Sequence, residues 1–200
     1  MNEGERIERE SMRQIEGFLS GYRMPEREVV KRVVHATADL SMAERVVFHG
    51  DAVEAGVRAL REGCTVFTDV EMVACGIRRE LLRELGGEVR CYISAPEVRE
   101  YAERTGMTRA RASVALHADE INGNVFVSGN SPTALEEVIE ACTPRLIVAA
   151  CVGFVGAAEV KERVLRGDVP AIVVRGRRGG SGVAAAIANS LLLLARYGWR

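Results

Sequence analysis

The chain has almost no lysine and no long apolar run. Only Lys31 and Lys161 are lysines, and the other basic residues are all arginine, a bias that genome composition or heat adaptation explains as readily as function. The longest mainly apolar run, residues 183–195, is too short to span a bilayer, and the amino terminus has no signal-peptide pattern. A formal net charge of −1 gives no reason to expect nucleic acid. We expect a cytoplasmic protein without a membrane or nucleic-acid partner.

Paired cysteines and metal-ligand spacings are also missing. The five cysteines form no C-x-x-C pair, are odd in number and mostly lie in apolar segments, namely Cys64, Cys75, Cys91, Cys142 and Cys151. We interpret them as reduced core residues. Nothing near them in sequence supplies the base and positive field that a cysteine nucleophile needs. We therefore expect no metal.

What is present is enough apolar sequence for one domain over residues 1–200, since 48% of the residues are hydrophobic. Residues 1–62 form a mainly helical front end, with helices expected at 3–20, 25–37 and 51–61. Residues 63–200 read as βα units. Strands are expected at 64–68, 89–93, 124–128, 145–150 and 171–174, and helices at 96–104, 109–121, 132–141, 157–165 and 181–195.

This alternation predicts a three-layer α/β fold in which helices cover both faces of a parallel sheet. Five strands in a chain of this length fit the flavodoxin-like order 2-1-3-4-5, with extra helices at the amino terminus. Ligands of such sheets bind beyond the carboxyl ends of the strands. The turns at that edge are therefore the place to look for a site.

Three of those turns carry glycine and lead into a helix, at residues 129–135, 152–159 and 176–182. Free backbone N–H groups and the helix dipole favour a carboxylate or phosphate there. Each turn also has an ordinary explanation, because glycine is common in turns and Ser131 or Ser181 could simply be an N-cap. The 176–182 segment matches neither the dinucleotide nor the Walker motif. Together the turns suggest an anionic ligand.

His35 lies on the polar face of its expected helix. At about 100° per residue, Val29, Val33 and their apolar neighbours form one arc, while Arg32 and His35 lie opposite. His35 is therefore not a core histidine, and its simplest interpretation is a solvated surface side chain. Arg32 precedes it by three residues, so a guanidinium and an imidazole point the same way and can meet an anion together.

Seven segments in fixed order carry a more specific signal. They are Glu10-Ser11, residues 32–39 (Arg-Val-Val-His-Ala-Thr-Ala-Asp), Thr68-Asp69 with Met72, Val73 and Gly76, Thr108-Arg109, residues 129–135, residues 152–156 with Lys161-Glu162, and residues 179–181 with Asn189. In this order and spacing they resemble the precorrin-8X methylmutase family, also called precorrin isomerase or cobalt-precorrin-8 methylmutase. The resemblance covers nearly the whole chain. One departure is Ala38, where the family often carries glycine.

The resemblance implies an isomerase of corrin-ring (vitamin B12) biosynthesis that needs no cofactor. It moves a methyl group from ring carbon C11 to C12 of precorrin-8X or cobalt-precorrin-8, giving hydrogenobyrinate or cobyrinate. The substrate is a flat apolar macrocycle fringed with carboxylates, which helix N-termini and arginines would suit. The resemblance also implies a homodimer with its sites near the subunit interface.

Carried over residue by residue, the resemblance makes His35 the catalytic residue. We interpret it as an acid, because a proton shared with the macrocycle makes the π-system electron-poor and eases methyl migration, and histidine can supply one near neutral pH. Ser11, Arg32, Thr108 and Arg109 are expected substrate contacts, and Asn130, Thr133, Gly180 and Ser181 are secondary ones. Arg109 would oppose the dipole in the first turn of its helix, which favours a ligand-facing role.

Several alternatives stay open. Asp39 and Asp69 either orient His35 or cap helices. His117 shares an arc with apolar residues, which suggests packing, and His49 precedes a turn. The same pocket would also serve a carrier that hands corrinoids onward, and the glycine turns would also suit an enzyme acting on a phosphorylated metabolite. The sequence does not distinguish a cobalt-containing ring from a metal-free one.

Overall fold

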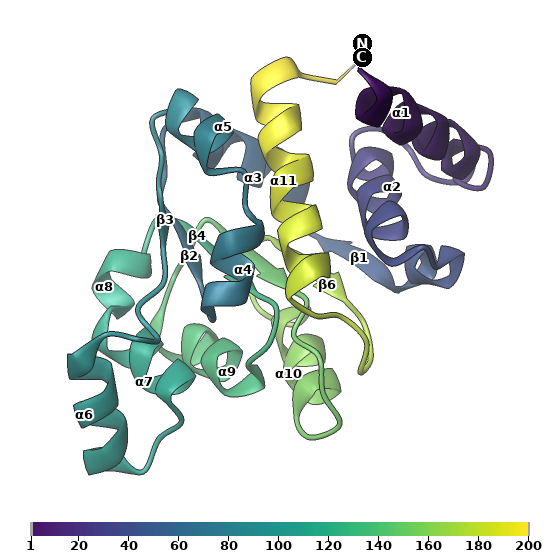
Figure 1. Cartoon of the computed structure of the whole chain (residues 1–200). Helices are drawn as coiled ribbons and strands as arrows, with labels where there is room; N and C mark the ends of the chain where they lie inside the picture. Colours follow the sequence, from purple (N-terminus) through teal and green to yellow (C-terminus); the bar gives the residue numbers. More distant parts are fainter. Residues whose placement is uncertain (1, 200) are drawn as a thin grey trace.

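The structure, a computed structural model that describes residues 2–199, is built on one mixed sheet of six strands (Figure 1). The strands are β1 (Val46–His49), β2 (Val66–Thr68), β3 (Val89–Arg90), β4 (Val125–Ser128), β5 (Leu146–Ala149) and β6 (Ala171–Val174). They lie in the order β1-β6-β5-β4-β2-β3. Strands β2 to β6 pair in parallel, and β1 pairs antiparallel with β6 at one edge of the sheet.

The expectation of five strands in a wholly parallel sheet is therefore wrong, because a sixth, antiparallel strand is present. The five expected strands do pair in parallel, and, counted along the chain, they lie in the order 2-1-3-4-5. The missed strand is β1, which pairs Val46 with Val174 and His49 with Ala171. Only Val46 of its residues is fully buried, so the strand shows neither a long apolar run nor an alternating pattern. Strand β3 is also shorter than the run expected at residues 89–93.

The helices fill two layers, one on each face of the sheet. They are α1 (Glu3–Glu16), α2 (Glu26–Thr37), the 3-10 helix η1 (Leu40–Arg45), α3 (Ala52–Arg61), α4 (Glu71–Gly76), α5 (Arg79–Glu84), α6 (Pro96–Thr105), α7 (Arg109–Leu116), α8 (Ala118–Ile121), α9 (Pro132–Ala141), α10 (Ala157–Val164) and α11 (Ser181–Tyr197). The single helix expected at 109–121 is two helices, broken at His117. None of the helices within residues 2–199 is long and apolar enough to cross a membrane.

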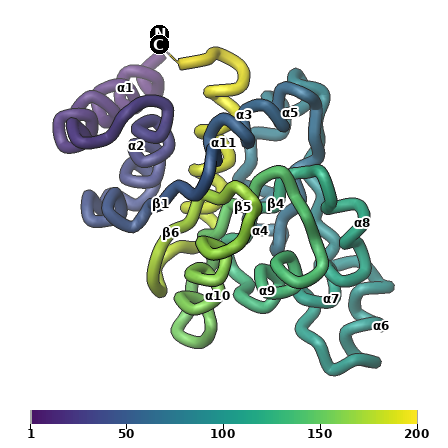
Figure 2. Tube along the Cα trace, turned by 180° about the vertical axis from the view of Figure 1, so that it is seen from behind, coloured from purple at the N-terminus to yellow at the C-terminus, as the bar shows by residue number. Residues whose placement is uncertain are grey.

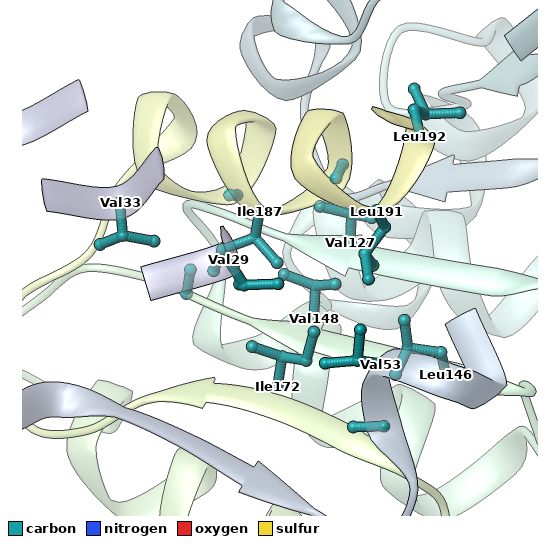
Figure 3. Packing of buried hydrophobic residues seen from close by; sticks show 14 of the residues in the cluster. Val29, Val33, Val53, Val127, Leu146, Val148, Ile172, Ile187, Leu191 and Leu192 are labelled. Carbon is teal, nitrogen blue, oxygen red and sulfur yellow. The ribbon is translucent and has the colours of Figure 1, made fainter. Parts of the chain in front are cut away.

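Successive side chains of each strand point to opposite faces of the sheet, so the sheet separates two hydrophobic cores. In β4, Val125 and Val127 join the core beneath α2, α3 and α11, while Phe126 joins the core beneath α7, α9 and α10. Figure 3 shows Ile187 of α11 and Val29 of α2 meeting above Val148 of the sheet. The first core runs from Leu19 to Ala195, so the amino-terminal helices and the βα units pack together.

The apolar arc predicted for α2 is confirmed, because Val29, Val30, Val33 and Val34 are all buried. The opposite side of α2 faces α1 and solvent, and His35 is exposed. Helix α1 contains no buried residue and packs on α2 at the edge of the molecule (Figure 2). The fold thus leaves the polar face of α2 available for a site.

The cysteines are all free, but they are not all core residues. Cys64, Cys142 and Cys151 are buried, and burial raises the pKa of each thiol to about 11. Cys75 is exposed, in contrast to the expectation of a core residue, because it lies on the outer side of α4. The three buried thiols stay neutral because of their raised pKa, and neutral thiols do not act as nucleophiles.

Candidate active site

The imidazole of His35 is held by a hydroxyl group from a different helix. The Ser11 Oγ atom of α1 lies 2.9 Å from His35 Nδ1, near the carboxyl end of α2. No other group within residues 2–199 makes a hydrogen bond to the ring. The second ring nitrogen, Nε2, is therefore left to meet a ligand.

A hollow of about 300 Å³ opens beside this pair. Its lining comes from α1, α2, α11 and the turn between α4 and α5, namely Glu8, Arg32, His35, Ala36, Arg78, Ala186, Asn189 and Leu193. A second hollow of about 320 Å³ shares Arg32 and Leu193 with it. A third of about 550 Å³ shares Arg78 and Leu193. The open surface therefore continues along α11 and offers room for a ligand larger than the first hollow.

The charge in the first hollow favours anions. The Arg32 guanidinium donates a hydrogen bond to the Glu8 carboxylate, and this bond lowers the pKa of Glu8 below its ordinary value. Electrostatic interactions with Arg78 and His35 also lower the pKa of Glu8. A carboxylate of the protein itself is thus stabilised where three cationic or titratable groups converge.

Asn189 connects this hollow to the turn that carries Arg78. Its Oδ1 accepts a hydrogen bond from the Arg78 backbone N–H at 2.8 Å, and its Nδ2 donates to the Gly76 carbonyl at 2.8 Å. Asn189 was predicted only as a motif residue, and neither Glu8 nor Arg78 was predicted from the sequence. Glu8 lies three residues before Ser11 on one helix face, which was a usable signal. Arg78 lies in a turn, where periodicity gives none.

A second group of predicted residues lies at the carboxyl ends of the strands. The Thr108 and Thr133 hydroxyls are 2.6 Å apart, and Ser131 Oγ is 3.1 Å from the Thr133 hydroxyl. Thr108 and Ser131 also cap α7 and α9 by accepting backbone N–H groups. The exposed Arg109 guanidinium has no hydrogen-bond or ion-pair partner within residues 2–199. It is therefore available to a carboxylate.

Asn130, Gly180 and Ser181 lie near this second group. A Cβ on Gly129 would lie 2.8 Å from the Ser181 Cα, so the turn after β4 touches the start of α11. Gly180 donates its N–H to the Ala150 carbonyl at 2.8 Å and, with a φ of 117°, adopts a conformation that favours glycine. Gly180, not Ser181, is the N-cap of α11, so the capping interpretation of Ser181 is wrong.

Neither Asp39 nor Asp69 orients His35. Asp39 accepts the Ser41 N–H at 2.9 Å and so caps η1, and it forms an ion pair with Arg178. The buried Asp69 carboxylate accepts three backbone N–H groups of residues 129–131 and the Ser128 hydroxyl. Burial raises the pKa of Asp69, and these donors oppose the shift. Its structural role is to hold the turn after β4.

The two groups of predicted residues do not meet within one chain. Ser11, Arg32 and His35 come together at the α1–α2 edge, whereas none of the second group lines the hollow beside His35. Figures 1 and 2 show α1 and α2 on one side of the molecule and α6, α7 and α8 on the other. The remaining histidines take structural positions: His117 stacks on Tyr92, and His49 bonds the Gly167 carbonyl.

Comparison with known proteins identifies the family. The precorrin-8X methylmutase family profile matches residues 6–194. The cobalt-precorrin-8 methylmutase of Salmonella typhimurium is 46% identical over 82% of this chain and 79% of its own length. That of Methanocaldococcus jannaschii is 39% identical over 98% of this chain and 92% of its own.

A solved structure supports the same assignment. The precorrin-8X methylmutase of Thermus thermophilus superposes with a TM-score of 0.87 at 36% sequence identity, covering 96% of this chain and 98% of that one. The profile, the sequence relatives and the structural neighbour agree over nearly the whole length of the chain. This chain therefore belongs to the precorrin-8X methylmutase family.

Proposed function

We propose that this protein is an isomerase of cobalamin biosynthesis that moves a methyl group from C11 to C12 of precorrin-8X or cobalt-precorrin-8. The product is hydrogenobyrinate or cobyrinate, and the enzyme works in the cytoplasm without a cofactor. Family membership supports the reaction. The observation that carries the site is the exposed His35, held by Ser11 through Nδ1, in an anion-favouring hollow.

The shape and charge of the surface suit a flat ring fringed with carboxylates. Leu193 and Ala186 give the hollow an apolar wall, and Arg32 and Arg78 place guanidinium groups at its edge. Arginine binds carboxylates in a planar, bidentate geometry. The neighbouring hollows along α11 extend the surface in the direction that a macrocycle would need.

In this proposal His35 acts as an acid through Nε2. It shares a proton with the macrocycle, which becomes electron-poor, the methyl bond to C11 breaks as the bond to C12 forms, and the proton returns to the histidine. No atom is gained or lost, so no second substrate is needed. A positioned acid of this kind contributes about 10²–10⁴-fold to the rate.

We further propose a homodimer whose sites contain residues of both subunits. Thr108, Arg109, Asn130, Thr133, Gly180 and Ser181 would then contact the substrate held at the partner's His35. Two observations support this arrangement. The two groups of residues lie apart within one chain, and His35 is exposed although an acid that protonates a ring works best when shielded from water.

The visible spectrum of the ring tests the function. Wild-type protein mixed with precorrin-8X, and separately with cobalt-precorrin-8, should convert at least one of them to the corrin chromophore. His35→Ala should bind that ring and leave it unchanged, while the control His49→Asn should convert it like the wild type. Binding without conversion by the wild type would favour a corrinoid carrier, and no binding would refute the proposal.

A further inference from the structure

Arg78 is the cationic group of the hollow that has no partner. Its guanidinium makes no hydrogen bond or ion pair within residues 2–199. The Arg78 hydrogen bonds are those of its backbone, where the N–H donates to Asn189 and the carbonyl accepts from the Leu82 N–H. Arg32, by contrast, is paired with Glu8. Both arginines line the hollow beside His35. The free guanidinium of this hollow is therefore that of Arg78.

The position of Arg78 is fixed although its side chain is exposed. Asn189 bonds the Arg78 N–H and the Gly76 carbonyl at the same time, and so ties the turn between α4 and α5 to α11. Helix α11 is itself packed over the centre of the sheet. The backbone from which the Arg78 side chain extends is therefore already ordered before a ligand binds.

The Glu8 carboxylate shows that the hollow stabilises a negatively charged group. Its carboxylate is stabilised first by the hydrogen bond from Arg32 and also by the charge of Arg78. The protein thus places a carboxylate within the field of both arginines without burying either one. A carboxylate of a ligand would meet the same field and could take the hydrogen bonds that Arg78 leaves unused.

We propose that Arg78 is a carboxylate-binding residue of this site and that Asn189 is its positioning residue. The inference rests on the proposed function, because it takes the ligand to be a corrin ring with carboxylate side chains. Arg78 binds one such side chain at the end of the hollow nearest α5, on the side away from Glu8's own helix. Asn189 acts only through the backbone of residues 76–78.

Binding of cobyrinic acid, followed by its visible spectrum, tests this assignment. The comparison ligand is the same ring with its carboxyl groups converted to amides. Arg78→Gln should weaken binding of the acid about tenfold or more, because a charged hydrogen bond is lost, and leave binding of the amide form unchanged. Asn189→Ala should weaken binding of the acid by a smaller factor and leave binding of the amide form unchanged.

Arg166→Gln is the matched control, because Arg166 is also an exposed arginine and lines none of the three hollows. It should bind both ligands like the wild type. The assignment is overturned if Arg78→Gln binds the acid normally, or loses the acid and the amide form equally. Turnover by the wild type is measured in a separate assay. If the wild type distinguishes the acid from the amide form through Arg78 but converts no substrate, the proposed reaction is refuted and the assignment of Arg78 stands.

Discussion

The Ser11 hydroxyl is the one protein group within residues 2–199 that bonds the His35 ring. It comes from α1, a helix with no buried residue, so the orientation of a proposed catalytic side chain depends on a peripheral element. A hydroxyl can donate or accept, so it can accommodate Nδ1 in either protonation state. This adaptability suits a histidine that gives up a proton and recovers it.

Ser11→Ala should therefore reduce kcat and leave KM nearly unchanged. The loss of one uncharged hydrogen bond predicts a decrease of about two- to tenfold. Steady-state assays with the ring substrate measure it. Ser11→Thr keeps the hydroxyl and should retain most of the activity. Equal rates for the alanine variant and the wild type would show that the 2.9 Å contact does not orient His35.

Glu8 is paired with Arg32, so we expect it to compete with a substrate carboxylate for this guanidinium. Glu8→Gln should lower KM about two- to fivefold, because a partly exposed ion pair of this kind contributes up to about 1 kcal/mol. The pKa of Glu8 is lowered, so the pair is complete above the ordinary glutamate pKa and is lost only as the pH falls through the lowered value. The effect on KM should therefore be constant across neutral pH.

Glu10→Gln is the matched control for this variant. Glu10 lies on the same helix and pairs with Arg13, outside the hollow. Its KM should equal that of the wild type. A KM for Glu8→Gln that is unchanged or raised would mean that the carboxylate helps to bind the substrate or has no influence on Arg32.

At the scale of the element, α2 ends in a conformation that its sequence does not favour. Ala38 has a φ of 51°, in the left-handed region where a Cβ costs energy, and it is the only residue other than glycine with a positive φ within residues 2–199. The chain turns there from α2 into η1. Ala38 is the departure from the family pattern noted above, and a glycine would adopt this conformation without strain.

Ala38→Gly should increase the free energy of unfolding by about 0.5–1 kcal/mol, because glycine adopts this φ without strain. Urea unfolding followed by circular dichroism measures the change. Ala36→Gly is the control: it lies in the last turn of the right-handed helix and should lose about 1 kcal/mol. A loss of stability in Ala38→Gly would show that the left-handed conformation is not strained.

The helices and strands that could be predicted are those whose own sequence pattern determines their conformation. Helix α2 was predicted because four valines at helical spacing form its buried face. Strand β1 was not, because its pairing with β6 joins segments more than a hundred residues apart. The site follows the same rule. Ser11, Arg32 and His35 were found through their motifs, whereas Arg78 became visible only when the fold brought its turn beside α2.

At the scale of the whole molecule, one chain holds two incomplete halves of the proposed site. His35 and Arg32 lie at the α1–α2 edge. Arg109 begins α7, which lies on the other side of the molecule (Figure 1), and its guanidinium has no partner within residues 2–199. Exposed apolar side chains add to the case for a covered surface, since Phe154 is 85% exposed and Val155 is 88% exposed. A twofold axis would place the halves of two chains together.

Mixed dimers test this arrangement. A chain with His35→Ala and a chain with Arg109→Gln, each inactive or nearly so as a homodimer, are produced together with different tags and the mixed dimer is purified. If each site takes His35 from one chain and Arg109 from the other, one site per mixed dimer is intact. Its activity should then be about half that of the wild type.

The opposite geometry gives a clearly different result. If both residues of a site came from one chain, each site of the mixed dimer would carry one defect and the activity would stay at the level of the homodimeric variants. Light scattering at micromolar concentration shows whether the wild type is a dimer at all, and a monomer would refute the shared site. Full activity of the Arg109→Gln homodimer would remove Arg109 from it. Activity that is recovered in the mixed dimer, and not in either homodimeric variant, therefore requires both a dimer and a site that spans its interface.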